Sequence, residues 1–74
     1  MAYKISIVRD GEGFEIIGNR EGLTAIAEVC LQLAQLPETR AESRRLGNHY
    51  HYADWAQNVE ADSIPLTILY DPEL

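Results

Sequence analysis

Polar and apolar residues alternate along the first part of the chain. In YKISIVR (3–9), Tyr3, Ile5 and Ile7 fall on one side of an extended backbone. DGEG (10–13) is rich in glycine and marks a turn, because glycine adopts positive φ without steric cost. FEIIG (14–18) then resumes the alternation. This pattern predicts a β-hairpin over residues 3–18.

The spacing of apolar residues changes to three and four after Asn19, which is typical of one face of a helix. The expected buried stripe contains Leu23, Ile26, Ala27, Cys30, Leu33 and Ala34, widened by Val29 and Leu36. The Asn19 side chain can cap the free backbone N–H groups of the first turn. Because Pro37 disfavours a helical residue before it, we expect the helix to end at about Gln35 or Leu36.

The second half of the chain has shorter apolar segments. Residues 37–47 offer almost no apolar face, so an extra helical turn and a loop remain equally compatible with them. HYHYA (49–53) and IPLTILY (64–70) read as strands joined by a polar connection. Pro65 cannot donate a backbone hydrogen bond and belongs at the start of a strand or on an edge.

This β-β-α-β-β order predicts an α+β fold within a single domain, residues 1–74. In its two-layer form, one helix packs on one face of a four-stranded, mainly antiparallel sheet. Val8, Ile17 and Leu69 then point away from the helix. That uncovered apolar surface favours a homodimer or a docked partner.

The charge, the absence of targeting signals and the cysteine count exclude some classes of partner and some cellular locations. Twelve acidic residues outnumber six basic ones, giving a net charge of −6 that disfavours binding to nucleic acid. No stretch resembles a signal peptide or a membrane span, so we expect a cytoplasmic protein. The one cysteine, Cys30, cannot form an internal disulfide and suits a reducing compartment. The arginines between residues 40 and 45 are interspersed with glutamates, as on a solvated surface.

The segment HYHYADW (49–55) carries the candidate chemistry. In a strand, His49 and His51 project from one face and could share a metal ion, but a zinc site needs three or four ligands. Catalysis is disfavoured, because Ser6, Ser43 and Ser63 lack the setting of an activated nucleophile. The pattern fits an ordinary sheet with tyrosines packed on one face and half-exposed histidines on the other. It also resembles a recognition surface, because aromatic residues anchor interfaces. Its candidate residues are His49, Tyr50, His51, Tyr52, Asp54 and Trp55.

Several short motifs together resemble a family of small bacterial immunity proteins that accompany polymorphic toxins. They are Ile16-Ile17-Gly18, Glu21-Gly22-Leu23, Leu33-Ala34, His49-Tyr50-His51 and Leu66-Thr67-Ile68. The resemblance covers nearly the whole chain and implies a protein that binds and neutralises a cognate toxin. It carries over His49 and His51 as functional positions. Residues 37–47 form a longer connection than the family pattern has, and Tyr52 stands where that pattern has an aliphatic residue.

We therefore expect a non-enzymatic, immunity-like protein that occludes a protein partner, possesses no cofactor and forms a homodimer. One alternative is a metal-binding or metal-assisted catalytic protein centred on His49 and His51. Another is a structural homodimer that uses Ile17 and Leu69 at its interface.

Overall fold

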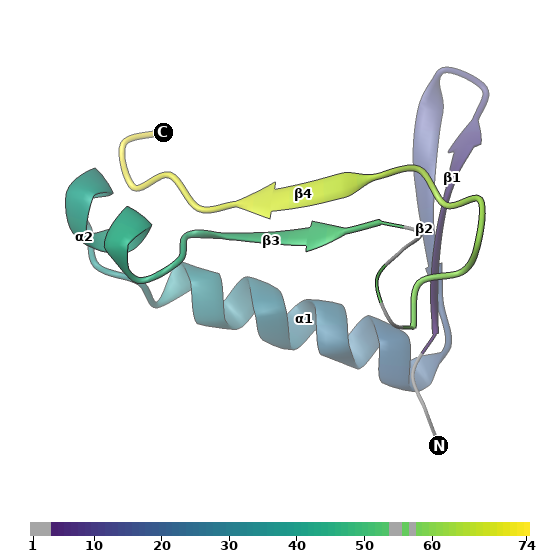
Figure 1. Cartoon of the computed structure of the whole chain (residues 1–74), viewed down its shortest axis with the longest axis horizontal. Coiled ribbons are helices and arrows are strands. Elements are labelled where there is room, and N and C mark those ends of the chain that lie inside the picture. The colour runs from purple at the N-terminus through teal and green to yellow at the C-terminus, as the bar shows by residue number, and fades with distance from the viewer. Residues whose placement is uncertain (1–3, 54–55, 57) are drawn as a thin grey trace.

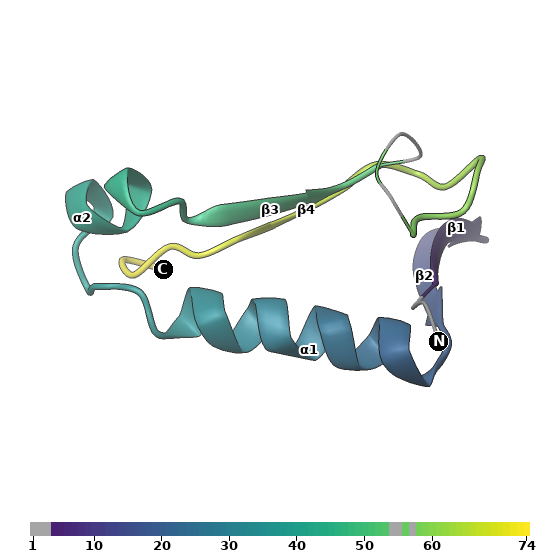
Figure 2. The same ribbon diagram turned by 60° about the horizontal axis from the view of Figure 1, so that its bottom comes forward.

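Two layers and a hairpin across their end make up the molecule (Figure 1). The computed structural model describes residues 4–53, 56 and 58–74. Its elements are β1 (Ile5–Asp10), β2 (Gly13–Gly18), α1 (Arg20–Ala34), α2 (Arg40–Arg45), β3 (His49–Tyr52) and β4 (Leu66–Leu69). Figure 2 shows α1 running beneath the β3–β4 ribbon, with the β1–β2 hairpin across one end and α2 at the other.

The hairpin forms as its alternating pattern predicts. β1 and β2 pair antiparallel, from Ile5 opposite Gly18 to Asp10 opposite Gly13. Gly11 lies in the connecting turn with φ of 61°, a conformation that side chains disfavour. Tyr3, which the pattern places in the first strand, lies outside the described residues.

Asn19 joins the first strand to the first helix. Its Oδ1 accepts hydrogen bonds from the backbone N–H of Gly22 at 2.8 Å and from that of Lys4 at 3.1 Å. The first bond confirms the expected N-cap of α1, which ends at Ala34 with Gln35 as its C-cap. A Cβ atom on Gly22 would collide with the backbone carbonyl of Lys4. The glycine is therefore required where helix and strand meet.

The expected single sheet of four strands is wrong. β1 and β2 form one two-stranded antiparallel sheet, and β3 and β4 form another. The reason lies in the second edge of β1, which a segment without regular strand structure fills. Ile5 donates to the carbonyl of Asn58 and accepts from Glu60, and the carbonyl of Ile7 accepts from Ile64. With that edge occupied, the second pair of strands cannot extend the first sheet.

The core lies where the two sheets and α1 meet. Ile5, Ile7 and Tyr52 are its buried members. The half-buried side chains packed against them are Ile26, Val59, Ile64, Leu66 and Ile68. The predicted helical stripe is only partly buried, because the β3–β4 ribbon is too narrow to cover it. Leu33 is buried, but Cys30 is exposed and Leu23 is 49% exposed.

Residues 40–45 form the short helix α2, so the alternative of a loop over this part of the 37–47 segment is excluded. Thr39 is the N-cap, and its hydroxyl accepts a hydrogen bond from the backbone N–H of Glu42. Ser43 is fully buried and donates its hydroxyl proton to the carbonyl of Arg40. Arg40 in turn fastens α2 to the C-terminal segment through Asp71.

The fold leaves much of its apolar surface uncovered. Ile17 is 51% exposed and Leu69 is 61% exposed, as the patterning predicts, but they lie on separate sheets and do not share one face. The radius of gyration is 13.5 Å, whereas about 11 Å is typical of a chain of this length. Neither described helix has the length and hydropathy that spanning a bilayer requires.

Candidate functional site

The alternation in β3 separates its histidines from its tyrosines. Tyr52 is 4% exposed and belongs to the core, while Tyr50 lies at its margin with its ring 4.9 Å from that of Tyr52. His49 and His51 project from the opposite face, and both are exposed. Tyr52 therefore supports the strand from behind instead of lying on the open surface.

The open face of the β3–β4 ribbon combines four side chains. His49 pairs with Leu69 across the strands, and His51 pairs with Thr67. All four residues are exposed, so no described part of the chain covers this face. We call it the histidine face. Of the other sequence-predicted site residues, Asp54 and Trp55 lie outside the described part of the chain.

Hydrogen bonds fix both imidazole rings. His51 Nδ1 lies 2.8 Å from the hydroxyl of Thr67, and His49 Nδ1 lies 3.2 Å from Oδ1 of Asn48. The two rings meet edge to face, with centroids 4.8 Å apart. Both Nδ1 atoms are thus engaged, and among the described residues no hydrogen bond engages either Nε2 atom.

Two imidazoles alone do not complete a metal site. Structural zinc takes four protein ligands and catalytic zinc takes three. Within the ranges that the structure describes, no group of three or more His, Cys, Asp or Glu side chains could hold a metal ion. Cys30 belongs to α1, which runs beneath the β3–β4 ribbon on the side opposite the histidines (Figure 2).

The buried serines have structural partners. Ser63 accepts a hydrogen bond from the backbone N–H of Ile7, and Ser43 donates to a carbonyl in its own helix. Their hydroxyls therefore satisfy backbone groups in the interior, where a substrate could not reach them.

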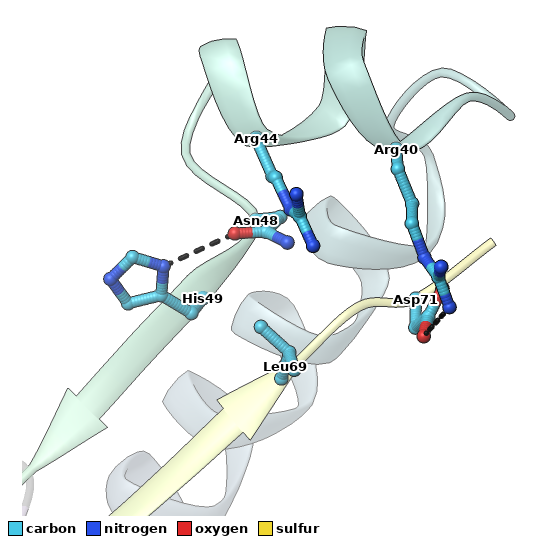
Figure 3. A pocket seen from close by; sticks show the side chains of 6 residues that line it. All are labelled: Arg40, Arg44, Asn48, His49, Leu69 and Asp71. Atoms are coloured by element: carbon cyan, nitrogen blue, oxygen red, sulfur yellow. Dashed lines mark hydrogen bonds and ion pairs between the residues drawn. The ribbon is translucent and has the colours of Figure 1, made fainter. Parts of the chain in front are cut away.

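A hollow of about 330 Å³ opens beside the histidine face, between α2, the start of β3 and the end of β4 (Figure 3). Six residues line it: Arg40, Arg44, Asn48, His49, Leu69 and Asp71. Arg40 holds Asp71 through two hydrogen bonds, from Nε at 3.1 Å and from Nη2 at 2.9 Å. Asn48 Nδ2 donates to the carbonyl of Tyr70 at 3.3 Å, so its Oδ1 is turned toward His49.

The electrostatics of the hollow depend on this pair. The hydrogen bond from Arg40 lowers the pKa of Asp71 below its usual value, and the backbone N–H of Glu73 adds to the effect. The same bond and the nearby carboxylates raise the pKa of Arg40. Asp71 is therefore a carboxylate at neutral pH, with both of its oxygens engaged.

Sequence reasoning missed most of this hollow. It read the arginines at 40–45 as a solvated surface, whereas Arg40 pairs with Asp71 across 31 positions. Local sequence patterns do not predict a contact between residues so far apart in the chain. The helix that carries the arginines did have a signal, because Thr39 and Glu42 have the spacing of a capping box.

Comparison with known protein families identifies a relationship. A family model described as immunity protein 32 matches residues 14–71, which is more than half of the chain. Neither the curated proteins nor the solved structures contain a match.

Proposed function

Since the chain belongs to the immunity protein 32 family, we propose that it binds a toxin protein and neutralises it by covering a surface that the toxin needs. The observation that carries this proposal is the uncovered histidine face, formed by His49, His51, Thr67 and Leu69. It joins two imidazoles to an apolar side chain on a strand pair that α1 and the core support from behind.

The amount of open surface suits a binding role. The accessible surface of the chain is 5517 Å², about 900 Å² more than the ~4,600 Å² typical of a folded protein of its mass. A standard interface buries about 800 Å² on each partner. The excess is therefore comparable with the area that one partner covers.

Inhibition of this kind needs no chemistry from the immunity protein. A bound chain prevents access to a toxin surface as long as its dissociation is slow, so buried anchors matter more than catalysis. We assign the anchoring role to His49, His51 and Leu69, because Tyr50 lies on the core side of the strand beside Tyr52. Asp54 and Trp55 follow in sequence and extend the proposed binding segment. The net charge of −6 accelerates association with a basic toxin.

We also place the protein in the cytoplasm, where the exposed thiol of Cys30 stays reduced. There the free protein self-associates through the face of α1 that the core leaves open. Leu23 and Leu31, which is 62% exposed, flank small side chains on this face. It lies apart from the histidine face, so a second copy and a toxin can bind together.

The direct test uses the product of the neighbouring gene, because immunity proteins are encoded beside the toxins they inhibit. We expect the protein to form a complex with that toxin and to suppress its activity. The double variant His49→Ala/His51→Ala loses about tenfold or more in affinity, as expected for central anchors. A matched control, Thr24→Ala/Glu28→Ala, alters exposed positions on α1 and leaves affinity unchanged.

Two results contradict the proposal. One is a double histidine variant that binds the toxin and protects against it as well as the unaltered chain does. That result would show that the histidine face is not the binding surface. The other is a neighbouring toxin that the protein neither binds nor inhibits, which removes neutralisation itself.

A further inference from the structure

The hollow beside the histidine face contains a second arginine, Arg44, whose charge contributes to the lowered pKa of Asp71 without a direct ion pair to it. Arg40 pairs with Asp71 and with Glu73, and Arg45 pairs with Glu42 at 2.8 Å. In the part of the chain that the structure describes, no hydrogen bond or ion pair engages the guanidinium of Arg44, whose backbone carbonyl accepts from Gly47. Figure 3 shows its side chain reaching from α2 to lie beside Asn48.

The acidic group in this hollow is already engaged. Both oxygens of Asp71 accept from Arg40, and Oδ1 also accepts from the backbone N–H of Glu73 at 2.9 Å. A carboxylate in such a pair has little capacity left for a second guanidinium. The donors of Arg44 therefore remain open to a group from outside the chain.

The other walls of the hollow are fixed and chemically distinct. Because Asn48 Nδ2 donates to the carbonyl of Tyr70, Asn48 Oδ1 accepts from Nδ1 of His49. Leu69 adds an apolar surface between these polar groups.

We propose that this hollow is a binding site for one carboxylate group, supplied in the complex by an aspartate or glutamate side chain of the toxin. The supply by a toxin rests on the function proposed above. An arginine fork binds a planar carboxylate through two parallel hydrogen bonds. Leu69 receives the methylene groups that precede such a carboxylate. A nucleic-acid phosphate is a poorer occupant, because the net charge of −6 repels a polyanion.

This site complements the way in which charge is distributed over the protein. An acidic chain attracts basic surfaces in many orientations. One open arginine, placed at the border of the histidine face, accepts an acidic group in a single orientation. It thereby adds specificity for the cognate toxin, since a toxin without an acidic residue at that position leaves the arginine unpaired in the interface.

The site is tested first without any toxin, by NMR titration of the whole chain with sodium acetate against sodium chloride at matched ionic strength. We expect saturable shifts at the Arg44 side-chain N–H, the Asn48 amide and the Leu69 methyl groups. Arg44→Gln abolishes them, and Arg45→Gln retains them because Arg45 is already paired with Glu42. Shifts of equal size at every arginine, or shifts that persist in Arg44→Gln, overturn the site. Stronger saturation by inorganic phosphate than by acetate overturns the choice of a carboxylate.

The second test measures toxin affinity with the same two variants. Arg44→Gln weakens binding about tenfold, and Arg45→Gln changes it by less than about twofold. Equal thermal unfolding of both variants shows that folding is intact. If the protein binds acetate but no toxin, the proposed function is wrong and the carboxylate site is still supported. Toxin binding that Arg44→Gln does not weaken overturns the acidic contact and leaves the function standing.

Discussion

The hydroxyl of Ser63 accepts a hydrogen bond from the backbone N–H of Ile7 at 3.1 Å, across 56 positions of the sequence. Both residues are buried, and the carbonyl of Ile7 accepts from the next residue, Ile64. Backbone groups of residues 58–64 form the other hydrogen bonds along this edge of β1, and the Ser63 side chain adds the bond to the N–H of Ile7.

Replacing Ser63 by alanine tests the value of this bond. The N–H of Ile7 then stays buried without a partner, so we expect the free energy of unfolding to fall by about 1–3 kcal/mol. Urea denaturation measures the change. Ser6→Ala is the matched control, since Ser6 lies on the other side of β1, and a loss there within about 0.5 kcal/mol is expected. Equal losses in both variants contradict a specific role for Ser63.

Gly22→Ala is expected to destabilise the protein even though alanine favours helices by about 1 kcal/mol over glycine. The new Cβ collides with the backbone carbonyl of Lys4, which lies between Asn19 and β1 and cannot withdraw freely. Overpacking of this kind costs about 1–3 kcal/mol beyond the helical gain. Thermal unfolding reports the difference, with Gln32→Ala on the exposed side of α1 as control. A more stable Gly22→Ala variant refutes the close contact.

The pair of Arg40 and Asp71 makes the stability of the fold depend on pH in the acidic range. The pKa of Asp71 is lowered in the folded protein, chiefly by the hydrogen bond from Arg40. Its stabilising effect is therefore fully present above the unfolded pKa of about 3.9 and is lost as the pH falls through the lower folded value. NMR titration of the Asp71 carboxyl measures this directly. In Arg40→Gln we expect its midpoint to rise; an unchanged midpoint contradicts the pairing.

Removal of metal is expected to leave the protein unchanged. The histidine pair offers two imidazoles where zinc requires at least three protein ligands. We expect no stoichiometric metal in protein purified without an affinity tag, and the same melting temperature with or without a chelator. Elemental analysis and differential scanning fluorimetry make the two measurements. One equivalent of tightly bound zinc would restore the metal-site alternative centred on His49 and His51.

Self-association is expected to depend on the open face of α1. Leu31→Glu places a charge between the apolar side chains of that face and converts a dimer to a monomer in sedimentation velocity, at an unchanged circular dichroism spectrum. Gln32→Glu introduces the same charge at the adjacent, exposed position and preserves the dimer. A wild-type chain that sediments as a monomer at every concentration removes this assignment.

Local patterning predicted the local elements. Alternation gives the hairpin, and three- and four-residue spacing gives α1 with Asn19 as its cap, because each depends on neighbours within a few positions. The sequence also places His49 and His51 on one face. The pairing of whole strands depends on which segment reaches the second edge of β1. Residues 58–64 take it through turns in which Asn58 and Asp62 adopt positive φ, and no apolar alternation announces them.

The residues that line the hollow also differ in whether the sequence predicts their position. Its histidine follows from the period of a strand, whereas Arg40 and Asp71 come together through the path of two separate connections. The open charge of Arg44 becomes visible only once the partners of its neighbours, Arg40 and Arg45, are known.

The dependence of β1 on residues 58–64 has a consequence for synthesis. A ribosome releases the hairpin first, with Ile5 and Ile7 still lacking the backbone partners that Asn58, Glu60 and Ile64 provide. Those partners leave the exit tunnel only after the hairpin, both helices and β3. The nascent chain therefore acquires its core in one late step, and a truncated product lacks the support behind its histidines.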